Sequence, residues 1–391
     1  MSRTLDLSHN ICLIPSLLFF FFGLSNAAYS VVDFGARPDG LSDSTQAFKK
    51  AWAKACGSTR AMTLYVPKGK YVVRPINFNG PCKSRVNVLI KGTILAPPDY
   101  RVLGQSRTWL LFYGVNGLTV KGGTIDARGA GYWSCKRHHG NCNIGAQSIS
   151  FIGCNDIVVD GLTSYNSQRM HVGIVGGRNA ALKYLTLRAP GGSPNTDGIH
   201  LQDTSGVTIV GSVIKTGDDC ISIGPGTRDV WIQQIACGPG HGISIGSLGN
   251  SIHEAGVQNI TVTGVVFWKT QNGVRIKSWA RPSNGFVRGV IFRNLVMNNV
   301  YNPIIIDQNY CLNNQCPHQN SGVKISGVKY RNIKGTSKSK VAVSFDCSPS
   351  SPCTGIKLQD IKLTYNHSPA VSSCSHIHGS TKGAVIPRSC F

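Results

Sequence analysis

The segment Ile260-Thr-Val-Thr-Gly-Val-Val-Phe267 has apolar residues at its first, third, sixth and eighth positions. The segment Ile356-Lys-Leu-Gln-Asp-Ile-Lys-Leu363 has the same pattern. Because successive side chains of a strand point to opposite faces, each apolar pair indicates a short strand with one inward face. The two-residue step between the pairs breaks the alternation, so we expect the chain to turn a corner there.

This pattern recurs along the chain at intervals of 23 to 39 residues. The copies begin at Val88, Leu118, Ile157, Leu182, Val207, Val230, Ile260, Val290, Val323 and Ile356. Such repeats cannot bury their apolar face alone and must stack on their neighbours. We therefore predict an all-β, single-domain, right-handed parallel β-helix of about ten coils over residues 28–391. A leucine-rich repeat is a weaker alternative, because no copy contains a helical stretch.

The two ends of such a helix need covers. Residues 43–55 read as a short N-terminal capping helix, with Asp43 at the N-cap and Gln46 three residues later. Phe48, Ala51, Trp52 and Ala55 would form its apolar face. The repeat stops after Leu363, so the cysteine-rich tail is expected to close the other end.

The charge balance indicates a polyanionic partner. The 391 residues include 40 Lys and Arg against 17 Asp and Glu, which gives a formal charge of +23. Nucleic acid, an anionic membrane and an acidic polysaccharide all fit a surplus of this size. With 41% hydrophobic residues the chain can bury a core, so extensive disorder is excluded.

The first 27 residues read as a secretory signal peptide. An apolar run over residues 11–24 is followed by the small residues Ser25-Asn-Ala27. A membrane anchor is the alternative, but the run is short for a bilayer and contains Pro15. We therefore expect an extracellular, cell-wall protein that meets neither nucleic acid nor, after cleavage, the membrane. An acidic polysaccharide is the remaining partner.

Secretion makes the cysteines candidates for disulfides. Pairing sequence neighbours gives 135–142, 220–237, 311–316, 347–353 and 374–390, with 56–82 less certain, although connectivity does not follow from sequence alone. Cys154 is left over as a buried free thiol. A zinc site is a weak alternative because no C-x-x-C pair exists. Asn259 and Asn366 are acceptors for N-glycosylation.

Five segments after the repeat align into a column of polar residues. They are Asp197-Gly-Ile-His-Leu201, Asp219-Cys-Ile-Ser-Ile223, His241-Gly-Ile-Ser-Ile245, Asn272-Gly-Val-Arg-Ile276 and Asn302-Pro-Ile-Ile-Ile306. Their third and fifth residues would point inward, and we expect the first residue on the outer face. Stacking then puts Asp197, Asp219 and His241 on successive coils, with the two carboxylates ~5 Å apart.

Arg275 and Lys277 follow on the same face, and Gly224 and Gly246 leave room in the row of Lys277. Crowded carboxylates raise one another's pKa, which suits general acid–base catalysis, and the two cations suit an acidic substrate. Each acid could instead be an ordinary turn residue. Asp197, Asp218, Asp219 and His241 could also bind Ca²⁺ or a transition metal, although the nearby cations argue against it. A serine triad with Ser222 or Ser244 lacks a nucleophile elbow. We expect no cofactor, and the residues alone leave the metal site open as an alternative.

At this point the chain resembles the plant polygalacturonases of glycoside hydrolase family 28. The motifs that carry the resemblance are Val31-Val-Asp-Phe-Gly-Ala36, Asn195-Thr-Asp-Gly-Ile-His200, Gly217-Asp-Asp-Cys220, Gly240-His-Gly-Ile243, Arg275-Ile-Lys277 and Asp307-Gln-Asn-Tyr310. The resemblance implies metal-free hydrolysis of α-1,4 bonds between galacturonates in pectin (homogalacturonan), with inversion, by a monomer.

The resemblance also implies roles for the candidate residues. Asp218 would be the general acid, while Asp197 and Asp219 would hold and activate the water. His241 would tune Asp218 or orient groups near it. Arg275 and Lys277 would bind a substrate carboxylate, and Tyr310 would contact the sugar. A pair of carboxylates ~5 Å apart ordinarily suggests that the anomeric configuration is retained. If Asp197 and Asp219 jointly hold one water, however, their spacing is not the distance from acid to base, and inversion stays open.

Two segments depart from the family pattern. Residues 278–283 stand where a Gln-Gly-Gly loop is common, and Arg169 adds a cation near the groove. Two other functions stay open: a catalytically silent, pectin-binding β-solenoid and a Ca²⁺-dependent pectate lyase. A pure binder needs the cations but not the three acids, so the intact acid set favours the hydrolase.

Overall fold

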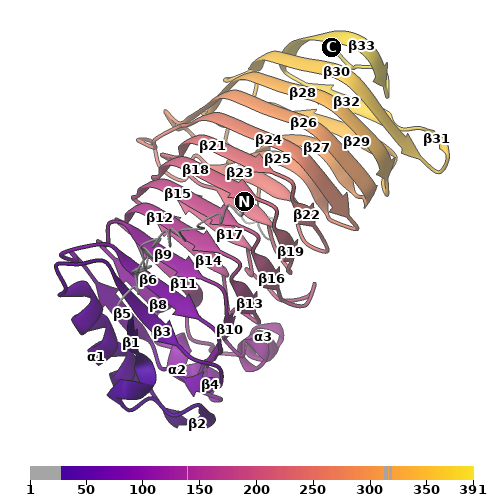
Figure 1. Cartoon of the computed structure of the whole chain (residues 1–391). Coiled ribbons are helices and arrows are strands. Elements are labelled where there is room, and N and C mark those ends of the chain that lie inside the picture. The colour runs from indigo at the N-terminus through magenta and orange to yellow at the C-terminus, as the bar shows by residue number, and fades with distance from the viewer. Residues whose placement is uncertain (1–27, 139, 312–315, 317–318) are drawn as a thin grey trace, which may run out of the picture.

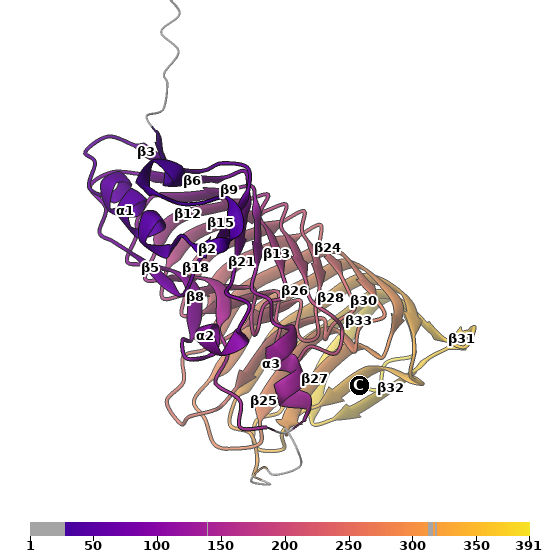
Figure 2. The same ribbon diagram turned by 90° about the horizontal axis from the view of Figure 1, so that it is seen from below.

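A computed structural model describes residues 28–138, 140–311, 316 and 319–391 of the chain. The expected signal peptide lies outside the described residues. The described strands wind into a parallel β-helix, which confirms the predicted fold class (Figure 1). Figure 2 shows the coils side by side, from the N-terminal end with helix α1 to the C-terminal end with strand β33.

One face of the β-helix is an eleven-stranded parallel sheet. Its strands are β5 (Ile76–Asn79), β8 (Thr108–Tyr113), β11 (Gln147–Ile152), β14 (Val172–Val175), β17 (Ile199–Gln202), β20 (Ile221–Ile223), β23 (Ile243–Leu248), β25 (Asn272–Trp279), β27 (Asn302–Tyr310), β29 (Val341–Asp346) and β32 (Val371–Ser375). We refer to it as the groove sheet, because it carries the site described below.

The other strands form two ladders that merge in strand β24. The first contains β1 (Ala28–Ser30), β3 (Met62–Val66), β6 (Val86–Ile90), β9 (Leu118–Lys121), β12 (Asn155–Asp160), β15 (Arg178–Lys183), β18 (Ser205–Val210), β21 (Arg228–Gln233), β24 (Val257–Trp268), β26 (Phe286–Val300), β28 (Lys324–Ser337), β30 (Cys353–Tyr365) and β33 (Ile377–Ile386). The second contains β2 (Asp39–Asp43), β4 (Lys70–Val72), β7 (Thr93–Leu95), β10 (Thr124–Asp126), β13 (Thr163–Tyr165), β16 (Thr186–Arg188), β19 (Val213–Lys215) and β22 (Ala236–Cys237). The short β31 (Ser368–Pro369) pairs antiparallel with β30.

The predicted corner between the two strands of each repeat is a column of residues with left-handed backbone. Gly264 has φ +63°, and its neighbours in register, Gln234 and Asn294, have +56° and +54°. This conformation reverses the alternation within two residues, so both flanking strands keep their apolar side chains inside. Glycine, asparagine and aspartate adopt it at the lowest cost, which explains their frequency at these corners.

Three of the predicted repeat origins, Val88, Leu182 and Val323, are out of register with the other seven. Leu118 pairs with Val86 rather than Val88, Ile157 pairs with Ala180 rather than Leu182, and the partner of Ile356 is Val328 rather than Val323, by the pairs that flank it. Two of these errors are slips of two residues, which keep the same face inward. Alternation alone cannot distinguish them. The other seven origins share one register.

Inward-facing residues of all three faces form one apolar core. Its N-terminal part contains an aromatic stack, in which the ring centroids of Phe78 and Phe112 are 4.7 Å apart and those of Phe112 and Phe151 are 5.3 Å apart. Each ring comes from the next strand of the groove sheet. The stacked repeat therefore builds a continuous core, as expected for one domain.

The described helices are short: η1 (Val31–Phe34, a 3-10 helix), α1 (Thr45–Cys56), α2 (Tyr100–Gly104) and α3 (Ala130–Arg137). Helix α1 buries the expected apolar face at the N-terminal end. The predicted N-cap was wrong, because Ser44 occupies that position, while Asp43 accepts a hydrogen bond from the backbone N–H of Thr45 at 2.9 Å. None of the described helices is long and apolar enough to cross a membrane.

All six neighbour pairs of cysteines form disulfides, and Cys154 is free and buried. Disulfides in this number are typical of proteins that fold in an oxidising compartment. Two of them lie in the C-terminal coils, where the repeat ends. The acceptors Asn259 and Asn366 are both exposed.

Candidate active site

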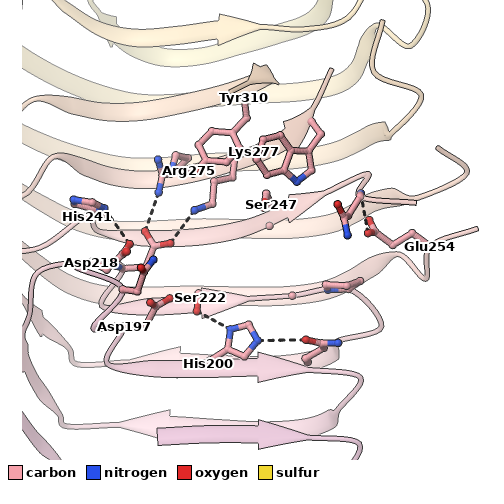
Figure 3. A pocket seen from close by; sticks show the side chains of 18 of the residues that line it. Asp197, His200, Asp218, Ser222, His241, Ser247, Glu254, Arg275, Lys277 and Tyr310 are labelled. Atoms are coloured by element: carbon pink, nitrogen blue, oxygen red, sulfur yellow. Dashed lines mark hydrogen bonds and ion pairs between the residues drawn. The ribbon is translucent and has the colours of Figure 1, made fainter. Parts of the chain in front are cut away.

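The polar column lies along a groove of about 940 Å³ on the groove sheet (Figure 3). Ile199, Ile221 and Ile243 pair in register on β17, β20 and β23, so Asp197, Asp219 and His241 stand on successive coils as predicted. The strands begin only at these isoleucines. The acids therefore lie in the turn before each strand, and the turn, not strand alternation, directs them into the groove.

Glycines next to the acids permit the close stacking of these turns. A Cβ on Gly198 would lie 2.5 Å from the carbonyl oxygen of Cys220, and a Cβ on Gly217 would lie 2.0 Å from that of Ser193. Side chains at these positions would push the coils apart. The disulfide Cys220–Cys237 fixes the strand that follows Asp219.

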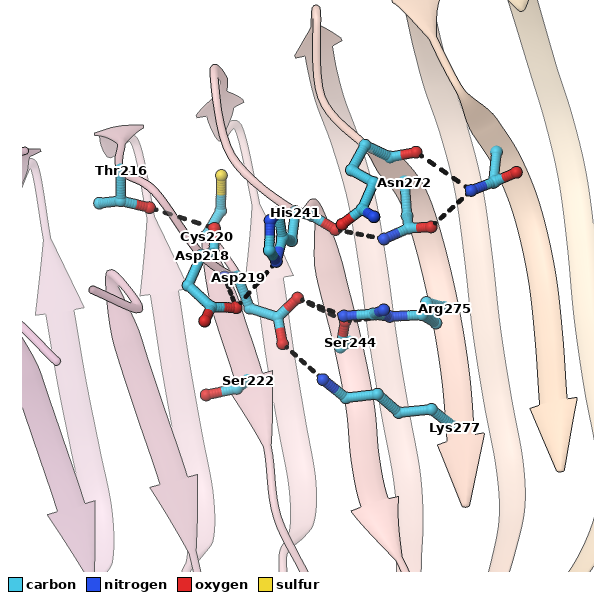
Figure 4. A network of polar contacts seen from close by, with 12 residues as sticks. Thr216, Asp218, Asp219, Cys220, Ser222, His241, Ser244, Asn272, Arg275 and Lys277 are labelled. Atoms are coloured by element: carbon cyan, nitrogen blue, oxygen red, sulfur yellow. Dashed lines mark hydrogen bonds and ion pairs between the residues drawn. The ribbon is translucent and has the colours of Figure 1, made fainter. Parts of the chain in front are cut away.

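Asp219 is buried and bound to two cations (Figure 4). One carboxylate oxygen, Oδ1, accepts hydrogen bonds from Arg275 Nη2 at 2.9 Å and Ser244 Oγ at 2.7 Å. The other, Oδ2, accepts one from Lys277 Nζ at 3.0 Å. A buried carboxylate needs such partners, because an uncompensated charge in this position would cost several kcal/mol.

Asp218 contacts His241 rather than the two cations. The two are joined by a hydrogen bond of 3.0 Å between Asp218 Oδ1 and His241 Nδ1, and the same oxygen accepts the backbone N–H of Asp219 at 2.8 Å. Burial opposes ionisation of Asp218, but the hydrogen bond and charge of His241, with Lys277, outweigh it and lower its pKa. The backbone N–H of His241 also donates to the Asp218 carbonyl at 2.8 Å.

Asp197 has the opposite environment. Burial and the charges of Asp218 and Asp219 raise the pKa of Asp197 to about 7, against a smaller lowering by Ser222 and Lys277. Near neutral pH the acid cluster therefore retains a proton, and Asp197 holds it in the ligand-free site. This split of pKa values between neighbouring carboxyls is the arrangement that acid–base catalysis uses.

Three outward side chains, His200, Ser222 and Ser244, have contacts in the site that were not predicted from the sequence. His200 Nδ1 lies 2.8 Å from Ser222 Oγ, and Ser222 lowers the pKa of Asp197. Ser244 supports both Asp219 and Arg275, the latter through a 3.0 Å bond to Nε. All three occupy the same register row as Arg275. That shared row is the signal by which they could have been found.

Aromatic rings cover the cations at one side of the groove. Lys277 Nζ lies 5.1 Å from the centroid of the Tyr310 ring, and Arg275 Cζ lies 5.9 Å from it. Trp279 stands 5.0 Å from Tyr310, centroid to centroid, and also lines the groove. Gly224 and Gly246 line it too, in the row of Lys277. The segment that departs from the family pattern thus contributes an aromatic wall.

A metal ion fits this cluster poorly. Ligand atoms of Asp218, Asp219 and His241 do lie within 4.8 Å of one another. However, both oxygens of Asp219 already accept hydrogen bonds from Arg275 and Lys277. A divalent cation would have to displace one of these cations or share its oxygen, which like charges oppose.

The groove along the parallel β-helix holds three carboxyls beside two buried cations, and the pKa values of Asp197 and Asp218 are shifted in opposite directions. This fold and site define a glycoside hydrolase for an acidic sugar chain. The chain belongs to glycosyl hydrolases family 28, whose family model matches residues 56–386.

Known proteins agree with this assignment. A polygalacturonase of Prunus persica is 53% identical over 383 residues, which cover 96% of this chain and 98% of the relative. An exopolygalacturonase of Platanus acerifolia is 42% identical over 371 residues, covering 93% and 97%. The crystal structure of a hyperthermoactive exopolygalacturonase from Thermotoga maritima has the same fold, with a TM-score of 0.73 over 90% of this chain and 91% of that chain, at 18% identity.

Proposed function

We propose that this protein is a polygalacturonase that hydrolyses the α-1,4 bonds between galacturonates of pectin. The observation that carries the proposal is the groove itself, where Asp197, Asp218 and Asp219 meet beside Arg275 and Lys277. A binding protein for pectin would gain from the two cations but not from three crowded acids. Membership of family 28 supports the same reaction class.

In this proposal Arg275 and Lys277 recognise the carboxylate of one galacturonate, and Tyr310 packs against the same ring. Guanidinium and ammonium groups that are already desolvated bind an anion more strongly than exposed ones do. Both are held by Asp219, so the substrate meets fixed cations rather than flexible ones. Preorganisation of this kind lowers the entropy cost of binding.

Asp218 serves as the general acid that protonates the leaving glycosidic oxygen. In the ligand-free site its pKa is lowered, which alone would leave it without a proton. A substrate carboxylate bound at Lys277 neutralises part of the field that lowers this pKa. The proton that Asp197 holds near neutral pH would then move to Asp218, leaving Asp197 ionised.

Asp197 and Asp219 then hold the attacking water, and Asp197 accepts its proton, which restores the protonation state of the ligand-free site. Attack from the side opposite the leaving oxygen inverts the anomeric carbon. His241, hydrogen-bonded to Asp218, stabilises the ionised form that Asp218 takes once it has given up its proton. No step requires a metal ion. The mature enzyme acts as a secreted monomer in the cell wall.

Reducing-end release from de-esterified polygalacturonate, in excess chelator, tests the proposal. We expect the wild-type protein to release reducing ends at an undiminished rate and the folded Asp218→Asn variant to release almost none. A rate that collapses in chelator and returns with Ca²⁺ would instead identify a pectate lyase. Binding without any release would identify a silent solenoid.

A further inference from the structure

A second cationic surface lies on a different face of the β-helix. Strands β26, β28, β30 and β33 of the first ladder present outward cations in two adjacent rows. One row contains Lys329 and Lys357, which pair in register. The other contains Arg293 and Arg331, which also pair, and Lys382, which follows Gln359. We call these five residues the outer cation face.

The cations of the outer cation face are regularly spaced, because their strands pair in register. Neighbouring strands of a sheet are about 4.8 Å apart, and residues two apart on a strand are separated by about 6.6 Å. Like charges at these distances repel, so the array costs folding free energy unless a partner compensates it. Two hollows of about 570 and 430 Å³ lie over these rows and share Arg293 and Arg331.

The protein itself does not compensate these charges. Within the described residues, none of the five cations lies within 4.0 Å of a carboxylate oxygen of another side chain. Asp360 is the one carboxylate lining the two hollows, and it accepts a hydrogen bond from Gln359 Nε2 at 3.1 Å. Four of the five cations, all but Arg293, are exposed to solvent.

The side chain of Arg293 is held in place by the ring of Trp231. Its guanidinium carbon lies 5.4 Å from the centroid of the Trp231 ring, and its buried Nε has no hydrogen-bond partner. Trp231 is itself anchored, because its indole N–H donates to Gln233 Oε1 at 2.9 Å. A guanidinium that a ring holds in position, and that no carboxylate of the described residues pairs with, is suited to bind an anion from outside.

We propose that the outer cation face is a second, non-catalytic binding site for the unesterified galacturonate chain that the groove cleaves. A polyuronate carries one carboxylate on every ring, so it can match a regular array of cations that a single small anion cannot fill. This inference rests on the proposed function. The second site would keep the enzyme on its polymeric substrate between cleavages.

The test compares two variants of equal net charge. One replaces four exposed residues of the outer cation face: Lys329→Gln, Arg331→Gln, Lys357→Gln and Lys382→Gln. The control replaces four exposed lysines near the N-terminal end: Lys50→Gln, Lys54→Gln, Lys68→Gln and Lys91→Gln. Both are also made with Asp218→Asn, so that binding is measured without cleavage, by affinity electrophoresis through gels that contain polygalacturonate.

We expect the outer-face variant to bind polygalacturonate roughly tenfold more weakly than the control, since each exposed pair contributes little alone. With Asp218 intact, its KM should rise for polygalacturonate and stay unchanged for trigalacturonate, which is short enough to occupy the groove alone. Equal retention of the two variants would overturn the site. If the outer-face variant lost as much retention in gels that contain polyglutamate as in gels that contain polygalacturonate, the assignment to a polyuronate would be overturned. Retention needs no hydrolysis, so failure of the proposed function would leave this outcome readable.

Discussion

The ammonium group of Lys277 lies 3.0 Å from the carboxylate of Asp219, and 91% of the lysine side chain is buried. This ion pair ties a residue proposed to bind substrate to one proposed to hold water. Removing the lysine leaves Asp219 paired with Arg275, whereas removing the carboxylate leaves two buried cations without it. Stability and activity can therefore be separated at this pair.

Asp219→Asn should lower the free energy of unfolding by about 3 kcal/mol, because it leaves Arg275 and Lys277 buried without their carboxylate. Lys277→Met should lower it less, because Asp219 keeps Arg275, and neither variant should hydrolyse polygalacturonate. Denaturant unfolding and reducing-end assays on these two variants and the wild type measure both quantities. Undiminished hydrolysis in either variant would remove that residue from the proposed chemistry.

Asp218→Asn should reduce hydrolysis of polygalacturonate by about 10² to 10⁴-fold while leaving the fold intact. An oligogalacturonide with a nitrophenolate leaving group needs no protonation, so this variant should cleave it at a rate near that of the wild type. Asp197→Asn should hydrolyse neither substrate, since both still need an activated water. The reverse pattern would assign the acid role to Asp197, which the ligand-free pKa values alone would favour.

The raised pKa of Asp197 predicts how stability varies with pH. The folded protein retains a proton on Asp197 up to about pH 7, while the unfolded chain loses it near pH 4. Between these values the folded state binds more protons, so this residue makes stability fall as pH rises, by up to roughly 1.4 kcal/mol per pH unit.

Two histidines act in the opposite direction in the same range. Burial lowers the pKa of His171 to about 3, and it lowers that of His200, so their contribution makes stability rise with pH up to about 6.5. The measurement is therefore the difference in unfolding free energy between wild type and Asp197→Asn from pH 4 to 7. A difference that does not change with pH would contradict the assigned proton.

Ser222→Ala should shift the alkaline limb of the pH–rate profile upward, by up to about one pH unit. Ser222 lowers the pKa of Asp197, so removing its hydroxyl raises that pKa. Ser164→Ala is a matched control, because Ser164 bonds the buried His171 away from the groove. Equal profiles for wild type and Ser222→Ala would show that Asp197 does not set this limb.

Much of the fold was predictable because apolar alternation reports directly on which face is buried. The errors occurred where apolar alternation gives no information. Slips at Val88 and Leu182 preserve the inward face. The start of the helix at Ser44 depends on which of two adjacent polar residues is the N-cap. The corner was predicted as a step, but its left-handed backbone at residues such as Gln234 was not, because side-chain type only partly determines it.

The acid column was predictable because the glycines and isoleucines beside each acid fix the alignment between coils. The pairing of Asp219 with Arg275 and Lys277 was not predicted, since it depends on how long side chains cross 56 and 58 residues of sequence between stacked coils. For a related reason, the sequence suggested Ser222 only as a possible nucleophile and gave His200 no role. The contact between these two side chains and the effect of Ser222 on the pKa of Asp197 depend on how the coils stack.

The most direct measurement is mass spectrometry of products from polygalacturonate digested in oxygen-18 water with excess chelator. The account predicts saturated oligogalacturonides or galacturonate, each new reducing end carrying one heavy oxygen from the attacking water. Unsaturated products lighter by one water, with no heavy oxygen, would contradict hydrolysis by the three carboxyls.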